Sequence, residues 1–213
     1  MTTTGLRTST LAIMRGAAVI ATALTVLTAV PARAGDSGGV KGTITAGKAA
    51  DPVVNAVVML EGPAVPAASD APHVVIDQRG DTFIPRVVAV AVGTTVEFAN
   101  SDPHLHNVFA MSKAKQFDLG MYPQGEKKSV TFDMPGAVPV RCNVHPGMDA
   151  YVVVHTNPYA AVSDERGVYA ITGVPEGSYT ARVWHERLPE RKIPIVVRSG
   201  QVQALDVHLD KAP

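Results

Sequence analysis

Three side chains with metal-binding atoms follow one another at even spacing near residue 145. The stretch VRCNVHPGMDA (140–150) contains Cys142, then His145 three residues later, then Met148 after three more. A thiolate, an imidazole and a thioether are soft or borderline donors. Cys142 is the only cysteine of the chain, so it has no intramolecular disulfide partner. A lone cysteine is an intermolecular bridge, a reactive thiol, a metal ligand or a buried core thiol, and its neighbours must decide between these.

A fourth donor lies upstream, where His106 begins a predicted strand within PHLHNVF (103–109). A thiolate, two imidazoles and a weak axial thioether suit a copper ion that cycles between Cu(I) and Cu(II), because the geometry is a compromise between the two states. The neighbouring His104 is interpreted as solvated, although it shares the face of His106. We therefore predict one mononuclear copper site with four ligands: His106, Cys142, His145 and Met148.

The segments that carry these residues have the alternation and the Gly or Pro punctuation of short β-strands, and long helical patterns are absent. The strands expected in the middle of the chain span residues 83–93, 94–100, 106–110, 126–132, 137–142 and 150–156. Because side chains alternate along a strand, Val138, Val140 and Cys142 share one face. Cys142 should therefore end a buried apolar face at the rim of a β-sandwich, and the fold class is predicted to be all-β.

The N-terminal residues are typical of a secretory signal peptide. Arg7 and Arg15 precede an uncharged apolar run at residues 16–30. The sequence ARA at 32–34 offers small residues for cleavage. The run is shorter than the roughly 20 residues of a membrane-spanning helix, so we favour a cleaved signal over an anchor. We expect residues 1–34 to be removed, leaving no membrane span, and the mature protein to be exported to the bacterial periplasm or another extracytoplasmic space.

Charge and length limit the partners and the number of domains. The chain has 19 Lys and Arg against 19 Asp and Glu; removal of three arginines with the signal leaves 16 against 19, a net charge near −3. Nucleic-acid binding needs a basic stripe that this composition lacks. The 179 residues that remain after 34 of the 213 are removed suffice for one large or two small domains.

The ligand pattern resembles that of the cupredoxins, the small blue copper proteins. The spacing of Cys142, His145 and Met148 is most similar to the short loop of amicyanin, while plastocyanin and azurin have longer loops. The segment FIPRVVAVAVGTTVEFANSDPHLHNVF (83–109) is similar to the cupredoxin stretch that leads to the first histidine ligand. The resemblance implies a Greek-key β-sandwich in which His106 is the inner ligand, Met148 the weak axial ligand, and His145 exposes a ring edge for electron exit.

The same resemblance implies two supporting residues. In the family, the asparagine after the remote histidine ties the two ligand loops together by hydrogen bonds, and here that residue is Asn107. Asn143 follows the cysteine, where the family often has a hydroxyl residue. Groups that contact the ligands tune potential and orientation, so this departure concerns the reduction potential and not the choice of metal.

The flanking segments are similar to a second family, the carboxypeptidase regulatory-like module, which is a transthyretin-type β-sandwich. Residues 38–62 predict two strands, and residues 163–211 predict four. In that family these pieces run almost consecutively, whereas here 100 residues (63–162) separate them. We predict that a cupredoxin domain at 73–156, reached by a linker at 63–72, is inserted into an outer sandwich built from 35–62 and 157–213. The alternative is two sandwiches in series with an N-terminal extension of strands.

The predicted function is an exported type 1 (blue) copper protein that carries single electrons between redox proteins. The resemblance to methylamine-utilisation-like proteins implies a dehydrogenase or a cytochrome as partner. The alternative is copper binding or handling without electron transfer. An enzyme is not expected, since a copper reductase or oxidase needs a second copper site or a substrate cavity, and a binuclear copper centre needs two cysteines. A purely structural role with a vestigial site is disfavoured by the intact set of four ligands.

Overall fold

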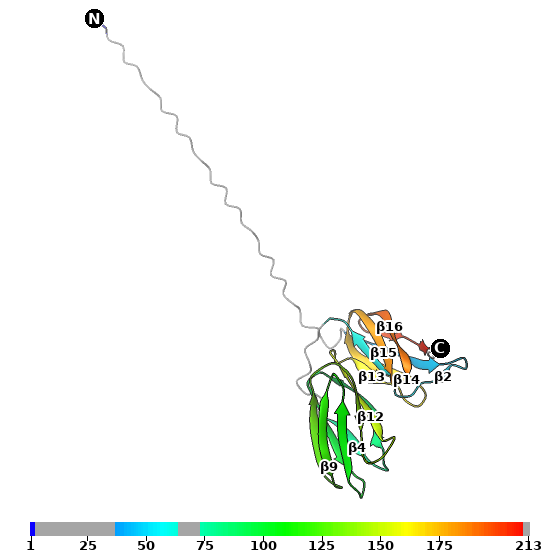
Figure 1. Ribbon diagram of the computed structural model, residues 1–213. Coiled ribbons are helices and arrows are strands. Elements are labelled where there is room, and N and C mark those ends of the chain that lie inside the picture. The colour runs from blue at the N-terminus through cyan, green and yellow to red at the C-terminus, as the bar shows by residue number, and fades with distance from the viewer. Residues whose placement is uncertain (3–36, 64–72, 211–213) are drawn as a thin grey trace. The chain divides into compact units, whose positions relative to one another are not determined.

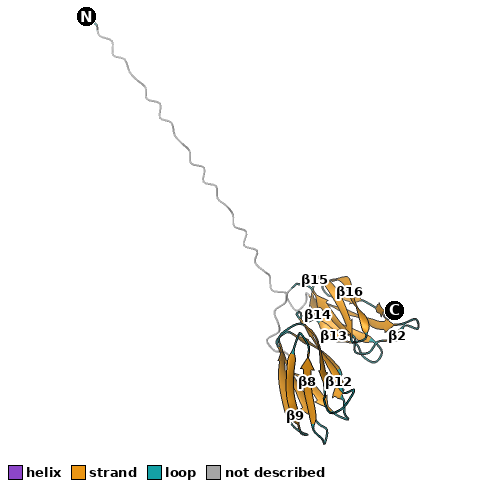
Figure 2. Cartoon of the chain, viewed as in Figure 1, coloured by secondary structure: helices purple, strands orange, loops and turns teal. Residues whose placement is uncertain are grey.

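The structure is a computed structural model that describes residues 1–2, 37–63 and 73–210. These residues form eighteen strands and no helix, which confirms the prediction of an all-β fold (Figure 2). The expected signal peptide at 1–34 and the expected linker at 63–72 lie outside the described residues, apart from residues 1–2 and 63. Within the described part, no helix is long and apolar enough to cross a membrane.

Strands β4 to β12 form two sheets around one hydrophobic core, and we call this unit the inner sandwich. One sheet has the order β10-β7-β4-β5 and the other β6-β12-β11-β8-β9. In β7 every second residue from Thr94 to Asn100 is buried, as the alternation along a strand requires. The strands are β4 (Val74–Gln78), β5 (Phe83–Ile84), β6 (Val87–Ala91), β7 (Thr94–Asn100), β8 (His106–Met111), β9 (Gln116–Tyr122), β10 (Lys127–Phe132), β11 (Gly136–Arg141) and β12 (Asp149–His155).

The remaining strands come from both ends of the described chain and form a second pair of sheets, the outer sandwich. Figure 1 shows the blue and cyan N-terminal strands grouped with the orange and red C-terminal strands, and the green strands grouped separately. Antiparallel pairing joins β1 to β14 and β3 to β15, so residues far apart in sequence are neighbours. The strands are β1 (Ser37–Ala46), β2 (Asp51–Pro52), β3 (Val57–Glu61), β13 (Ala160–Val162), β14 (Val168–Pro175), β15 (Gly177–His185), β16 (Leu188–Val197), β17 (Val202–Ala204) and β18 (Val207–Leu209).

The strands differ from the prediction in several places, and β2, β4 and β13 are additional to those expected. The strand expected at 83–93 is divided into β5 and β6 around Pro85, which has no N–H to donate to a ladder. Strand β9 was not predicted, although Phe117 and Leu119 alternate with exposed Gln116, Asp118 and Gly120 and pack against the core. The expected last strand is divided into β17 and β18. Between them, the N–H of Thr43 on β1 donates to the Asp206 carboxylate instead of a backbone carbonyl.

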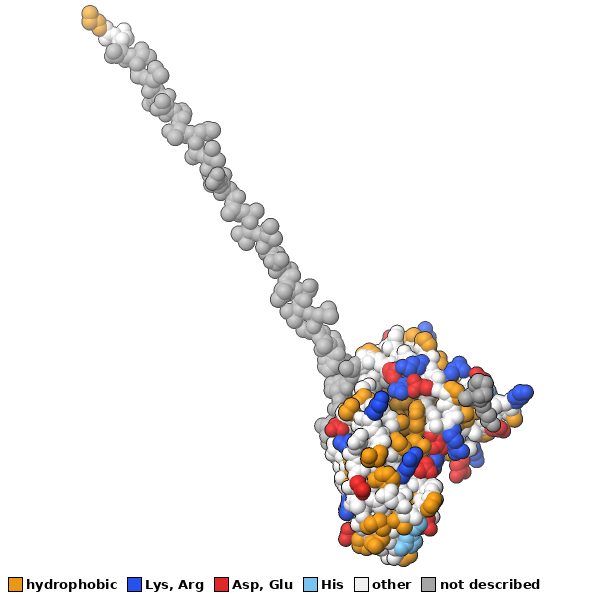
Figure 3. All heavy atoms as spheres, viewed as in Figure 1, with side chains coloured by type: hydrophobic (Ala, Val, Ile, Leu, Met, Phe, Trp, Pro, Cys, Tyr) orange, Lys and Arg blue, Asp and Glu red, His pale blue; other side chains and the backbone are white. Residues whose placement is uncertain are grey.

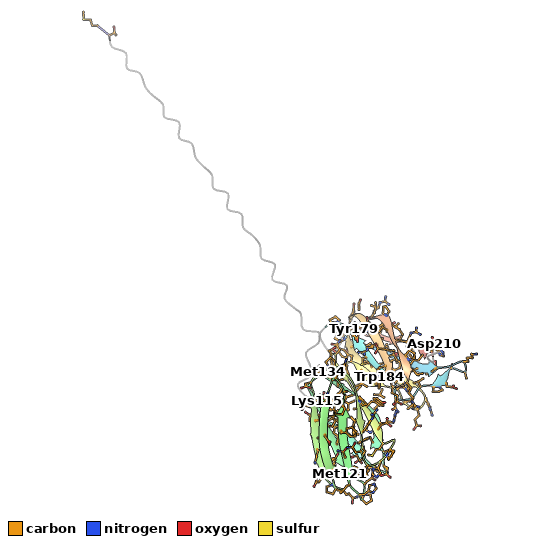
Figure 4. The ribbon with its side chains drawn as sticks, viewed as in Figure 1. Lys115, Met121, Met134, Tyr179, Trp184 and Asp210 are labelled. Carbon is orange, nitrogen blue, oxygen red and sulfur yellow. The ribbon has the colours of Figure 1, made fainter. Side chains whose placement is uncertain are left out.

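A separate hydrophobic cluster joins the two sandwiches. It contains Val57 and Met59 of β3, together with Val87 of β6 and Val153 of β12. Because neighbours of Val153 along β12 point into the inner core, Val153 itself points out of it. The ring of Trp184 on β15, labelled in Figure 4, lies 5.4 Å from the ring of Tyr151 on β12. Apolar and aromatic contacts therefore hold the inner sandwich against the outer one.

Phe98→Ala tests the inner core. The Phe98 side chain is fully buried and its ring centroid lies 5.9 Å from that of Phe117. The truncation should lower the free energy of unfolding by about 3–5 kcal/mol, because buried surface is lost and a cavity remains. Denaturant unfolding measures the change, with the exposed Val92→Ala as the control, expected within about 0.5 kcal/mol of wild type. A loss no larger than that of the control would contradict the assigned core.

Acid should weaken the fold through Glu186. The Arg86 guanidinium bonds to this carboxylate and lowers the pKa of Glu186 to about 2, from an ordinary 4.5. A carboxylate whose pKa falls on folding adds stability that is complete above the unfolded pKa and is lost as pH falls toward the folded one. Between pH 4.5 and about 2, wild type should lose unfolding free energy more steeply than Glu186→Gln in denaturant titrations. Parallel curves for the two proteins would rule this out.

Candidate metal centre

Donor atoms from β8 and from the loop after β11 converge at one end of the inner sandwich. His106 is the first residue of β8 and is fully buried, while Cys142 follows β11 and is 8% exposed. Strands β8 and β11 are neighbours in one sheet, so backbone pairing brings these two residues together. His145 completes the set: its Nδ1 lies 3.1 Å from Nδ1 of His106, and each of these nitrogens lies 3.8 Å from Cys142 Sγ.

The spacing of the three atoms fits a single metal ion. In a triangle with sides of 3.1, 3.8 and 3.8 Å, the point equidistant from the corners lies about 2.1 Å from each, and protein metal–nitrogen and metal–sulfur bonds are about 2.0–2.3 Å. An ion could therefore lie in the plane of Cys142, His106 and His145 without displacement of any donor. A trigonal set of one thiolate and two imidazoles is typical of blue copper sites.

The loop that carries Cys142, His145 and Met148 is closed by its own backbone. The N–H of Cys142 donates to the Met148 carbonyl at 3.2 Å, and the N–H of Met148 donates to the His145 carbonyl at 3.1 Å. Gly147 takes a positive φ of 85°, which lets the chain reverse without the cost that a side chain would meet. Met148 is buried in the same core cluster as Cys142, so its thioether is on the inner side of the loop.

Asp102, which was not predicted as a site residue, fixes the far side of His106. The Nε2–H of His106 donates to Oδ2 of Asp102 at 2.8 Å, and the N–H groups of Gly80 and Asp81 donate to the same carboxylate. Burial alone would raise the pKa of Asp102, but these hydrogen bonds lower it below its ordinary value. With Nε2 protonated, Nδ1 of His106 keeps its lone pair for the side where Cys142 lies. The signal in the sequence is one aspartate four residues before the histidine.

Asp81 and His104 lie close to the Nε2 atoms of the paired histidines. His104 Nε2 is 2.7 Å from Asp81 Oδ1, which is also 3.7 Å from His145 Nε2 and 3.8 Å from His106 Nε2. One ligand atom from each of these four residues lies within 4.8 Å of the others. Asp81 and His104 are both about half exposed and bind each other, and Cys142 faces the Nδ1 atoms instead. His104 is thus a neighbour of the centre on the side of the rings away from the thiol.

Asn107 makes a different contact from the one that was expected. Its Nδ2 donates to Asp118 Oδ1 on β9 at 2.7 Å, and its buried Oδ1 has no hydrogen-bond partner among the described residues. The expectation that this side chain ties the two ligand loops together is therefore wrong for this structure. The physical reason is that β9 and β11 flank β8 on opposite sides, and Asp118 binds the amide on the β9 side. Asn143 is exposed.

The outer edge of His145 reaches the surface beside exposed hydrophobic side chains. Its side chain is 27% exposed, and the residues before each histidine ligand, Leu105 and Val144, are exposed hydrophobic side chains. Figure 3 shows pale-blue histidine side chains at the lower end of the view, bordered by orange hydrophobic ones. Met121, labelled at the same end in Figure 4, is also exposed and pairs with Asn107. One imidazole edge is therefore accessible, with exposed hydrophobic side chains and the Asp81 carboxylate close to it.

Residues 72–155 match the family model described as copper binding proteins, plastocyanin/azurin family. No curated protein is a match for the chain. Among solved structures, a copper-containing nitrite reductase (NirK) from Thermus scotoductus SA-01 is 30% identical at a TM-score of 0.38, covering 44% of this chain and 25% of that one. A novel purple cupredoxin from Nitrosopumilus maritimus is 23% identical at a TM-score of 0.36, and the match covers 38% of this chain and 99% of that one. A reduced amicyanin variant is 25% identical at a TM-score of 0.37, and the match covers 46% of this chain and 98% of that one.

The chain thus spans a quarter of the nitrite reductase and nearly all of the other two proteins. The match to the family model begins before β4 and ends with β12, so it coincides with the inner sandwich and does not extend to the outer one. Over residues 72–155 the chain is similar to the plastocyanin/azurin family of copper-binding proteins.

Proposed function

We propose that this chain is an exported blue copper protein that carries single electrons, with one copper ion bound by His106, Cys142, His145 and Met148. The observation that carries the proposal is the triangle of one sulfur and two imidazole nitrogens, whose sides fit a trigonal site. Bound copper supplies the one-electron exchange between Cu(II) and Cu(I). No enzymatic step is proposed, because one buried ion with four protein ligands leaves no position for a substrate.

The protein's contribution is to keep the donors fixed and dry. His106 and Met148 are almost fully buried, and Cys142 is covered by the same core. Asp102 holds one imidazole, and two backbone hydrogen bonds hold the loop that carries the other. Donors that are held in position before an electron arrives do not need to reorganise when it does, which favours rapid transfer.

The exposed edge of His145 supports a route for the electron to and from a partner. This ring bonds the proposed ion through Nδ1 and reaches the surface beside Leu105 and Val144. These apolar side chains lose little on desolvation, so a redox protein can approach the ring closely from their side. By resemblance, we propose a dehydrogenase or a cytochrome as this partner.

We further propose that residues 73–156 are a cupredoxin domain inserted into an outer sandwich of the carboxypeptidase regulatory-like type, built from 35–62 and 157–213. The pairing of Met59 with Ala160 supports this arrangement, because the chain leaves β3 and returns in β13 beside it. An inserted domain needs such closely spaced ends. The N-terminal pattern of residues 1–34 supports export to the periplasm or another extracytoplasmic space.

Copper handling without electron transfer is the second candidate. Asp81 and His104 favour it, because they place two exposed donors beside the outer nitrogen of His145, where a metal ion could be passed to or from another protein. Such a protein would bind Cu(I) without colour and exchange it readily. A blue oxidised form with reversible one-electron electrochemistry distinguishes the leading proposal.

Cys142→Ser tests the copper site. The copper-loaded wild type should absorb strongly in the visible range through charge transfer from thiolate to Cu(II), and the serine variant should lose this band because its hydroxyl is a hard, neutral donor. Visible absorption and voltammetry measure the effect. His208→Ala is the matched control, since His208 is an exposed histidine of the outer sandwich near Asp210. A colourless wild type would end the proposal of electron carriage.

Asp102→Asn tests the hydrogen bond behind His106. A carboxylate makes the imidazole a stronger donor and favours the more highly charged Cu(II). The neutral amide should weaken Cu(II) binding by roughly 10- to 100-fold, and a tenfold loss relative to Cu(I) raises the reduction potential by about 59 mV. Chelator competition and voltammetry give the two values. Asp133→Asn, which removes an exposed carboxylate paired with Lys115, should change neither.

A further inference from the structure

Arg86 connects the outer sandwich with the end of the metal-binding loop. Its two terminal nitrogens donate to the two carboxylate oxygens of Glu186, each at 2.7 Å. One of them also donates to Oδ2 of Asp149 at 2.5 Å. Glu186 belongs to the turn between β15 and β16 of the outer sandwich, and Asp149 directly follows Met148 in the inner one. One guanidinium thus binds a carboxylate from each sandwich.

The surroundings fix the position of this guanidinium. Glu186 is only 6% exposed, and a paired, planar contact between arginine and a carboxylate defines both distance and direction. The guanidinium carbon lies 5.6 Å from the centre of the Tyr151 ring, which itself contacts Trp184. The backbone carbonyl of Arg86 accepts the N–H of Tyr151 at 2.8 Å. Arg86 is therefore held from the outer side by Glu186 and from the inner side by Tyr151.

A hollow lies beside this end of the loop. Its volume is about 430 Å³, and Cys142, Met148, Asp149 and Tyr151 are among the residues that line it. Asp149 pairs with Arg141 across β11 and β12, and the preceding carbonyl of Met148 accepts the N–H of Cys142. A restraint on Asp149 is therefore also a restraint on the two ends of the loop that carry sulfur.

We propose that Arg86 is a positioning residue through which the outer sandwich holds the Met148 end of the metal-binding loop. Glu186 orients Arg86, and Arg86 holds Asp149. The proposal rests on the copper site proposed above for its functional meaning. The axial ligand tunes the reduction potential of a blue copper site. The outer sandwich therefore contributes to this potential although it supplies none of the proposed metal ligands.

A bridge that only joins the two sandwiches would behave differently from a positioning contact. It would change the stability of the assembly and leave the loop hydrogen bonds as they are. The amide protons of Cys142 and Met148 report on these bonds directly, because both donate within the loop. Their hydrogen exchange can be followed by NMR in the copper-free protein, without dependence on metal loading.

Glu186→Gln is the decisive variant, and Glu190→Gln is its matched control. Each removes a carboxylate that binds an arginine at 2.7 Å, but Glu190 and its partner Arg182 both belong to the outer sandwich. In Glu186→Gln the Cys142 and Met148 amides should exchange at least about tenfold faster than in wild type. In the control they should stay within about twofold. Fluorescence of Trp184, the single tryptophan, checks that the sandwiches remain in contact.

Arg86→Lys provides a second test that keeps the charge and removes the two-pronged contact. It should also accelerate exchange of the loop amides, and in the copper-loaded protein it should change the ratio of Cu(II) to Cu(I) affinity by at least threefold, about 28 mV. Normal exchange in both variants would overturn the positioning role, even if the protein is blue. A colourless wild type with fast exchange in the variants would instead overturn the proposed electron carriage and leave the positioning role intact.

Discussion

The approach of one sulfur to two imidazole nitrogens is the constraint around which the inner sandwich is arranged. Each nitrogen lies 3.8 Å from Cys142 Sγ and the two nitrogens lie 3.1 Å apart, which is close enough for one shared ion. This spacing requires β8 and β11 to be neighbours, since they carry His106 and lead into Cys142. It also requires a loop tight enough to return His145 to the same point.

Hydrogen bonds outside this triangle determine how firmly it is held. Asp102 is itself fixed by the backbone of Gly80 and Asp81, so the turn before β5 supports His106 through the carboxylate. The loop on the other side depends on its own backbone and on the contact between Asp149 and Arg86. The centre is thus restrained from two directions, by elements that have no ligand of their own.

The sequence predicts most of what depends on local spacing and little of what depends on distant contacts. Period-two alternation predicted the fold class, and the Cys142, His145 and Met148 series predicted the similarity of the inner sandwich to copper-binding proteins. Asp102 and Arg86 were missed because a single charged residue gives no periodic signal, and its partner is chosen only by the folded chain. The contact of Asn107 was missed for the same reason: its amide binds Asp118 on β9, a strand that was not predicted.

The side-by-side position of Met59 and Ala160 has a consequence for the history of such chains. The chain leaves the sheet at one strand and returns at the strand paired with it. The intervening hundred residues can therefore be gained or lost while the sheet of the outer sandwich keeps its hydrogen bonds. A simple hairpin could close the gap. For the proposed insertion, this means that another module of similar span could take the place of residues 73–156 between the same two strands.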